Sequence, residues 1–319
     1  MKYVLAPLAG FTDAPFRRLC SEFGADLTYT EMVSAAGLAH GSSPTRHLFE
    51  TMEGEGPVAI QLFGAREDDL AFATDLVTRL VESVRPRRIV ELNLNAGCPM
   101  TKVTREGAGA KLAEDPELIG RLLSAMVANT SLPVTLKTRL GPHPQRATIF
   151  EILAAAESAG AKGLIVHARY TSQMHGGAVH LDMLRDIVSR AHIPITGNGS
   201  VVDAQTAAAM AATGVDAIMI GRAAVSRPWF FNELKTSQPT PSRRDVFERH
   251  LDYLLRFRNQ LAEHFPADHI PSQDGFASVK MHVHLFRYFN GLPGAAELRR
   301  KLNAVRTLEE IESNVRRYL

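Results

Sequence analysis

Residues 89–99, Ile-Val-Glu-Leu-Asn-Leu-Asn-Ala-Gly-Cys-Pro, carry the sequence signal from which the fold and the chemistry of the chain can be worked out. The segment Ile89–Leu94 alternates in polarity and begins with β-branched residues, so it predicts a β-strand. Gly97 and Pro99 end the strand and place Cys98 on the loop that follows it. Most free cysteines act as small buried hydrophobes. The flanking asparagine, glycine and proline instead favour a reactive thiol here.

The composition indicates an ordinary soluble protein. The chain has 319 residues, of which 45% are apolar and 22% charged, and its net charge of +2 does not by itself argue for a nucleic-acid partner. Cys20 and Cys98 are too few for a disulfide framework and have no metal-ligand spacing, so we expect a reducing cytoplasm and no metal site. The apolar start is interrupted at Pro7 and Gly10, and no later run is long enough to cross a membrane.

Strands alternate with helices over roughly the first 235 residues. The expected strands cover residues 3–6, 26–32, 58–63, 89–94, 134–139, 163–167, 194–198 and 217–221. The expected helices cover residues 14–22, 68–83, 116–128, 148–159, 181–190, 204–212 and 227–234. About eight strand–helix units of this length predict an α/β fold of the (β/α)8 TIM barrel type, with a doubly wound sheet as the alternative.

Polar residues at the strand ends favour the barrel. In a barrel the carboxyl ends of all strands meet on one face, where active sites lie. The polar residues at these ends are Gln61, Asn95, Lys137, Arg139, His167 and Asn198. On the helix over residues 68–83, the spacing places on one side Leu70, Phe72, Leu76, Val77 and Leu80.

A composition break at residues 237–242, Ser-Gln-Pro-Thr-Pro-Ser, predicts a linker. We therefore expect two domains, a barrel over residues 1–238 and a small C-terminal helical domain over residues 239–319. Helical spacing continues from Val246 to Leu261, and further helices are expected over residues 279–289 and 298–302. Residues 241–319 hold 13 Lys and Arg against 10 Asp and Glu, so the mild basic excess lies in this part.

Two consecutive strand ends predict a phosphate site. Barrels often bind phosphate with the loops after strands seven and eight. Asn198, Gly199 and Ser200 form the first loop, where glycine permits close approach of the backbone. Gly221 and Arg222 form the second and add a planar cation.

Lys137 and His167 lie at the ends of strands five and six. A lysine facing into a barrel needs an anionic or polar partner. Lys137 could contact an anion or a flavin carbonyl, or it could act as a Schiff-base amine. His167 could contact a phosphate or a ring, or it could be a hydrogen-bonded core histidine.

Nine short motifs in order resemble the tRNA-dihydrouridine synthase family, in its bacterial branch. They are Ala6–Asp13 (APLAGFTD), Gln61–Gly64 (QLFG), Asn95–Pro99 (NAGCP), Lys102–Val103, Gly107–Ala110 (GAGA), Lys137–Arg139 (KTR), His167–Arg169 (HAR), Asn198–Ser200 (NGS) and Gly221–Arg222. The resemblance covers the barrel from near Leu5 to about Trp229. The helical tail is similar, more loosely, to the family's C-terminal tRNA-binding domain.

The resemblance implies an FMN-binding barrel that reduces uridines in tRNA to 5,6-dihydrouridine, with NADPH recharging the flavin. It implies a hydride from the flavin to C6 and a proton from Cys98 to C5 of the uracil ring, with Asn95 and Arg169 near the base. A thiol of ordinary pKa is mostly protonated at pH 7, which suits an acid. The resemblance implies that Pro7, Leu8 and Ala9 line the flavin and that Gln61 and Lys137 contact its ring system. The residues implied to hold its ribityl phosphate are His167, Asn198, Gly199, Ser200, Gly221 and Arg222.

The predicted partner is tRNA, and no obligatory protein partner is indicated. The target base must be extruded from folded tRNA into the pocket, which needs basic residues to hold the phosphates. The tail residues considered for this are Arg243, Arg244, Arg256, Arg258, Lys280, Arg287, Arg299, Arg300 and Lys301.

Three alternatives stay open from the residues alone: a flavin barrel oxidoreductase acting on a free pyrimidine, a Schiff-base barrel lyase using Lys137, and an RNA-binding protein with an inactive barrel. The chain departs from the usual residues of the family at four positions, so the modified tRNA position is also open. These positions are Asn93, Ala168, Tyr170 and Ser200.

Overall fold

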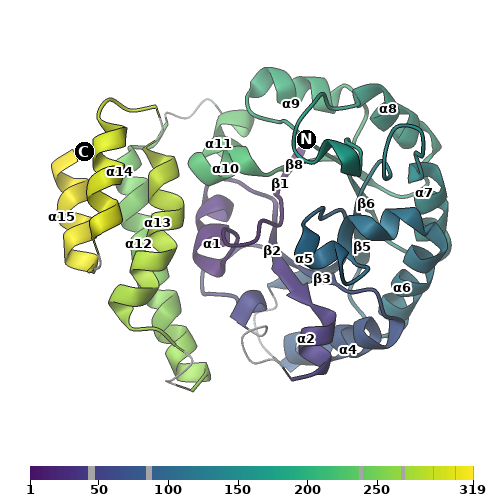
Figure 1. Ribbon diagram of the computed structural model, residues 1–319, viewed down its shortest axis with the longest axis horizontal. Helices are drawn as coiled ribbons and strands as arrows, with labels where there is room; N and C mark the ends of the chain where they lie inside the picture. The colour runs from purple at the N-terminus through teal and green to yellow at the C-terminus, as the bar shows by residue number, and fades with distance from the viewer. Residues whose placement is uncertain are drawn as a thin grey trace.

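The computed structural model describes residues 1–41, 47–83, 88–236, 240–266, 270–289, 291–305 and 307–318. Eight parallel strands form a closed barrel in chain order, with helices around it (Figure 1). The strands are β1 (Lys2–Leu5), β2 (Leu27–Ser34), β3 (Val58–Phe63), β4 (Ile89–Ala96), β5 (Val134–Arg139), β6 (Leu164–His167), β7 (Ile195–Asn198) and β8 (Ala217–Ile220). The prediction of a (β/α)8 barrel, and not a doubly wound sheet, is confirmed.

Several helices of the barrel begin at side-chain caps, at Asp13, Ser34, Asp115 and Asp203. Asp13 accepts a hydrogen bond from the backbone N–H of Phe16, and Pro15 stands in the first turn, where its missing N–H costs nothing. The helices are α1 (Ala14–Glu22), α2 (Ala35–Ala39), α4 (Glu67–Ser83), α5 (Thr101–Thr104), α6 (Pro116–Ala128), α7 (Ile149–Ser158), α8 (Leu181–Arg190), α9 (Ala204–Ala211), α10 (Arg222–Ser226) and α11 (Phe230–Lys235). Short 3-10 turns cover His47–Phe49, Gly109–Glu114 and Thr171–Gln173.

The helix expected near residues 227–234 is present as α11, which begins later, at Phe230. A separate helix, α10, comes directly after β8 and was not predicted. The break between them includes Arg227, whose backbone is not helical (φ −144°, ψ 74°). Pro228 follows it, and a proline disfavours the helical conformation of the residue before it. Arg222 consequently lies on the first turn of a helix rather than on a free loop.

The inward side of α4 was only partly predicted. Leu70 and Val77 are fully buried as expected, and Leu76 packs partly against the core, but Phe72 and Leu80 are 46% and 37% exposed. The buried stripe instead passes through small residues such as Ala73 and Thr74, one and two positions after Phe72. A helix that packs closely on a barrel accepts small side chains there, so hydrophobicity alone misplaces the stripe.

The C-terminal part is entirely helical where it is described, and it lies beside α1, α10 and α11 (Figure 1). Its helices are α12 (Arg243–His264), α13 (Gln273–Tyr288), α14 (Ala295–Ala304) and α15 (Leu308–Tyr318). The helices expected over residues 279–289 and 298–302 are present and longer, whereas α15 was not predicted. The expected domain boundary between residues 238 and 239 lies outside the described residues.

One apolar cluster joins the two parts of the chain. Ala14, Leu19, Met52 and Trp229 of the barrel pack together with residues from α12 to α15, so the helical tail covers a buried face of the barrel. Along the described residues, no helix combines the length and the apolar character needed to cross a membrane.

Candidate active site

A pocket opens at the carboxyl ends of the strands. It collects thirteen of the fourteen residues predicted for the site. Those that line it are Pro7, Leu8, Ala9, Asn95, Cys98, Lys137, His167, Arg169, Asn198, Gly199, Ser200, Gly221 and Arg222. Residues from six of the eight strand ends therefore meet in one place, as parallel strands of a barrel require.

Gln61 is the predicted residue that does not line the pocket. Its side chain is fully buried, and both ends of its amide are used: Nε2 donates to Asn93 Oδ1 and Oε1 accepts from Asn95 Nδ2, each at 2.7 Å. Asn93 in turn donates to Thr135 Oγ1 at 2.7 Å, and Thr135 donates to Glu91 at 2.5 Å. We call this chain of side chains the polar ladder.

The polar ladder ends at Asn95, which shapes the Cys98 loop. Asn95 Oδ1 accepts hydrogen bonds from the backbone N–H groups of Gly97 at 3.1 Å and Cys98 at 3.0 Å. The carbonyl oxygen of Cys98 accepts from Ala110 N–H at 2.9 Å. Gly109, at a φ of +62°, lets the chain pass there, because a Cβ at this position would lie 2.6 Å from the Cys98 carbonyl oxygen. The half-buried thiol is thus held on a fixed loop in the pocket wall.

Arg139 connects this loop to the one after β6. The guanidinium is buried, with Nε donating to Gly97 O at 2.8 Å and Nη1 donating to Met174 O at 2.6 Å. One cation thereby fixes the backbone on two sides of the pocket. Arg139 was predicted to lie at the polar end of a strand but was not predicted to be part of the site.

Arg169 holds the wall formed by the loops after β6 and β7. Its Nη2 donates to Ser200 Oγ at 2.7 Å and to Gly177 O at 2.8 Å. Its Nη1 lies 3.2 Å from His167 Nε2. Because a guanidinium can only donate, Nε2 must be the accepting nitrogen of a neutral His167 ring. Beside them Gly199, at a φ of +133°, lets the His167 ring pack close to the backbone, because a Cβ at this position would lie only 3.2 Å from the ring.

Positive charge is crowded in the pocket. Lys137, Arg139, Arg169 and Arg222 line it, and the described lining includes no carboxylate. Burial, and then the neighbouring Arg139, lowers the pKa of Lys137 to about 8. Burial, and then Arg169, lowers the pKa of Arg139 to about 10. Since each cation disfavours the charge of the next, an anion bound among them would relieve the repulsion, so the pocket selects anionic ligands.

Several lining residues were missed from the sequence. His175 stacks on His167 with ring centroids 6.3 Å apart, and Met32, Met219 and Val202 add apolar surface. His175 lies on a loop with no motif, so only its spatial position reveals it. Met32 and Met219 lie on strands, where the sequence pattern could not separate an inward pocket side chain from ordinary core.

The sequence of this chain matches the model of a known protein family. The family model described as Dihydrouridine synthase (Dus) matches residues 4–319. The chain belongs to the dihydrouridine synthase family. The match continues through the helical tail, beyond Trp229, where the resemblance was expected to be looser. The predictions of this family and of an enzyme are confirmed.

Curated relatives cover most of this dihydrouridine synthase. A tRNA-dihydrouridine synthase B from Pectobacterium carotovorum is 36% identical over 235 residues, which are 73% of this chain and 71% of the relative. A probable tRNA-dihydrouridine synthase from Mycobacterium leprae (strain TN) is 31% identical and covers 97% of this chain and 86% of its own length. One from Mycobacterium tuberculosis (strain ATCC 25618 / H37Rv) is 32% identical, with 97% and 80% covered.

Proposed function

We propose that this dihydrouridine synthase reduces uridines in tRNA to 5,6-dihydrouridine, with FMN as its bound cofactor and NADPH as electron donor. The observation that carries the proposal is a cationic pocket without a described carboxylate, in whose wall a thiol is held on a fixed loop. The pocket favours a phosphate-bearing ligand, and the thiol offers a transferable proton. The names of the relatives support tRNA as the substrate.

The residues present fit FMN. The phosphate would be held by Arg169, Arg222 and the backbone at Gly199, all of which line the pocket. The ring system would lie against the short apolar segment Pro7–Ala9 and Met219. His167, Asn198, Ser200 and Gly221 complete the pocket. Asn198 donates to the carbonyl oxygen of Met219 at 2.9 Å, so it serves to fix this wall.

FMN held in this pocket would provide the hydride chemistry needed at C6 of the uracil ring. The remaining requirement is a proton at C5, and we assign it to Cys98 Sγ. The backbone at Cys98 is fixed by Asn95 and Ala110, so the thiol is positioned before the substrate arrives. Asn95 has both ends of its amide occupied, and we assign it to positioning this loop rather than to hydrogen bonding with the base.

Lys137 lies opposite Asn95 in the register of β4 and β5. Its protonated amine would attract electron density toward the flavin ring or the uracil carbonyls. A pKa of about 8 also leaves a fraction of free amine near neutral pH, which a Schiff-base lyase would need. Borohydride distinguishes the electrostatic role of Lys137 from the Schiff-base role, because only a Schiff base would be trapped covalently on Lys137.

We further propose that residues 239–319 form the tRNA-binding domain and that the enzyme acts in the cytoplasm on tRNA, with the barrel of residues 1–238 binding FMN. Not all of the basic tail residues are equally available for phosphate. Arg244, Arg256 and Lys301 form exposed ion pairs within their own helices, which water and phosphate compete with easily. Lys280, which is half-buried, is paired with the buried Asp13.

The experiment is cofactor analysis of the purified full-length protein. We expect a flavin absorption band, release of FMN on denaturation, and bleaching by NADPH with recovery on addition of tRNA. Arg222→Ala should retain less FMN, whereas Arg185→Ala, which removes an exposed arginine of α8, should retain the same amount. A protein that neither purifies with a flavin nor binds added FMN contradicts the proposal, as does trapping of a substrate on Lys137 by borohydride.

A further inference from the structure

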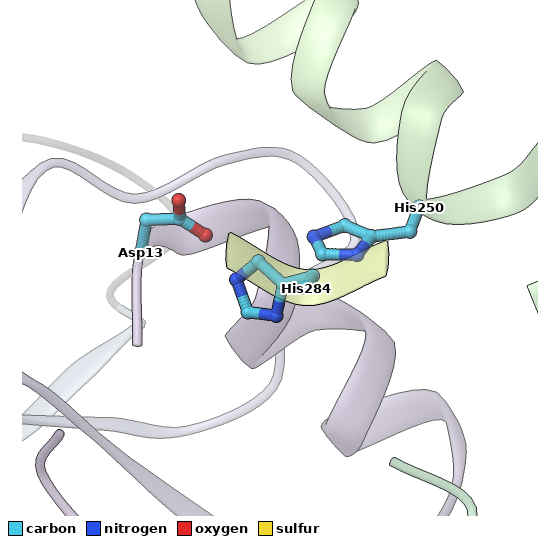
Figure 2. A group of neighbouring side chains, drawn as sticks. All are labelled: Asp13, His250 and His284. Carbon is cyan, nitrogen blue, oxygen red and sulfur yellow. The ribbon is translucent and has the colours of Figure 1, made fainter. Parts of the chain in front are cut away.

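A second polar cluster lies away from the pocket, where the helical tail meets the barrel. Asp13, at the start of α1, points toward His250 of α12 and His284 of α13 (Figure 2). One ligand atom from each lies within 4.8 Å of the other two. The side chains of both histidines have no exposed surface, and Asp13 is 7% exposed. None of the three lines the active-site pocket.

The histidines lack the hydrogen bonds that buried rings normally make. Among the described residues, neither His250 Nε2 nor either ring nitrogen of His284 has a hydrogen-bond partner. Leaving a buried polar atom unpaired costs about 1–3 kcal/mol, and buried side chains in native proteins are mostly satisfied. Three such atoms beside a carboxylate therefore point to a ligand.

The hydrogen bonding around His250 suits a metal ion. His250 Nδ1 lies 2.8 Å from the Tyr288 hydroxyl. If Nδ1 donates to that oxygen, Nε2 carries the lone pair, and a bond of this kind typically orients a metal-binding histidine.

We propose that Asp13, His250 and His284 bind one divalent transition-metal ion, with Zn²⁺ as the best fit, which fastens the helical tail to the barrel. Two imidazoles and a carboxylate suit zinc, with water as a fourth ligand, whereas magnesium and calcium prefer oxygen ligands alone. Zinc bonds of about 2.0–2.2 Å place tetrahedral ligand atoms about 3.4 Å apart. The three side chains need only draw together from separations of at most 4.8 Å.

Lys280 is the group that competes with the metal. Its Nζ lies 3.1 Å from Asp13 Oδ2, the oxygen left over because Oδ1 accepts from Phe16 N–H at 3.1 Å. Nζ also lies 3.9 Å from Glu31 Oε1. When a metal ion binds Asp13, Lys280 therefore still has the carboxylate of Glu31 as a partner. The competition predicts that removing the Lys280 amine strengthens metal binding.

The test uses full-length protein stripped with a chelator and titrated with ZnCl₂. We expect one zinc per chain by calorimetry and by metal analysis after gel filtration, and a higher Tm with zinc. Co²⁺ in place of zinc should give visible d–d bands without a thiolate-to-cobalt band. That absence, and unchanged stoichiometry in Cys98→Ser, separates this site from the thiol in the pocket.

Variants decide which side chains bind the ion. His250→Ala and His284→Ala should lose the zinc, whereas His264→Ala, an exposed histidine on the same helix as His250, should keep it. Tyr288→Phe should weaken zinc affinity about tenfold by freeing the His250 ring. Lys280→Met should strengthen it. These two milder variants, together with the wild type, test the site even if the alanine variants do not fold.

The opposite results overturn the proposal. They are a stripped wild type that takes up no zinc, zinc uptake that persists in both folded histidine variants, a cobalt spectrum with thiolate character, or a Lys280→Met variant that binds no more tightly than wild type. The last result, combined with a lower Tm, would make the cluster a plain ion pair between the barrel and the tail.

Discussion

Asn95 and Cys98 are joined within one turn, because the side-chain oxygen of Asn95 accepts a hydrogen bond from the backbone N–H of Cys98 at 3.0 Å. The same amide donates to Gln61 at 2.7 Å, so the loop that carries the thiol is tied to the interior of the barrel. The position of the Cys98 thiol is therefore set by the polar ladder beneath the pocket.

Asn95→Ala should lower both stability and activity. It leaves Gln61 Oε1 and two backbone N–H groups without partners in a buried place, which costs about 1–3 kcal/mol for each unsatisfied group. Thermal unfolding measures the loss of stability. The rate at which tRNA reoxidises the reduced flavin measures the effect of displacing the thiol. Asn95→Asp keeps an acceptor for the loop but loses the donor to Gln61, so it should restore part of the activity. Equal rates in wild type and Asn95→Ala would show that the loop needs no such support.

Cys98→Ala should abolish only the step that involves tRNA. The flavin should still bind, because Cys98 is not among its phosphate contacts, and NADPH should still reduce it. Loss of a positioned general acid typically slows the step about 10²–10⁴-fold. Stopped-flow reoxidation of the flavin by tRNA makes the measurement. Cys20→Ala is the control, since Cys20 is fully buried in α1 and should affect stability alone. Wild-type reoxidation by Cys98→Ala would exclude this cysteine as the acid.

FMN affinity should fall as the pH rises through about 8. Burial lowers the pKa of Lys137 from its usual value to about 8, so the amine is protonated below that pH and loses its charge above it. An anion binds best to the protonated form, and affinity is therefore highest on the acidic side. Arg139, with a pKa of about 10, stays charged over this range. Fluorescence titration of FMN between pH 7 and pH 9 tests the expectation, and Lys137→Met should have a flat profile over the same interval.

Arg287→Ala should weaken tRNA binding. Arg287 lies on α13, over the ring of Phe11 at 5.0 Å, and Phe11 belongs to the segment after β1 that borders the pocket. Arg287 is exposed, whereas Lys280, the other basic tail residue described in contact with this segment, is paired with Asp13. Its loss should reduce the salt slope of tRNA affinity by about 1. Arg316→Ala, an exposed arginine of α15 paired with Glu312, is the control and should bind like wild type.

The barrel was predictable because its signals are local. Most strands contain a short apolar run bounded by turn residues, and β3 and β5 have the bounds that the sequence predicts. Strand ends in a barrel converge whatever the details of packing, so the polar residues at those ends gave most of the pocket. The start of α10 was missed because Arg222 follows β8 without a capping residue or a linker.

The remaining features depend on which way a side chain points. Gln61 was expected at the flavin, but its amide is turned into the polar ladder, and the strand pattern says only that it faces inward. His175 reaches the pocket from a loop whose path no motif reports. Asp13, His250 and His284 come from three distant parts of the chain, and only the packing of the tail on α1 brings them together. Sequence spacing therefore gave no signal for this cluster, which the fold brings together.

The apolar cluster shared by Trp229, Leu19 and the tail helices has a consequence for cooperativity. Because the same side chains complete the interior of both parts, neither can lose its structure without exposing the interior of the other. The barrel and the tail should therefore melt in a single calorimetric transition, with the calorimetric enthalpy equal to the van't Hoff enthalpy. The chain is therefore expected to be one cooperative folding unit, although it contains two structural parts with different proposed roles.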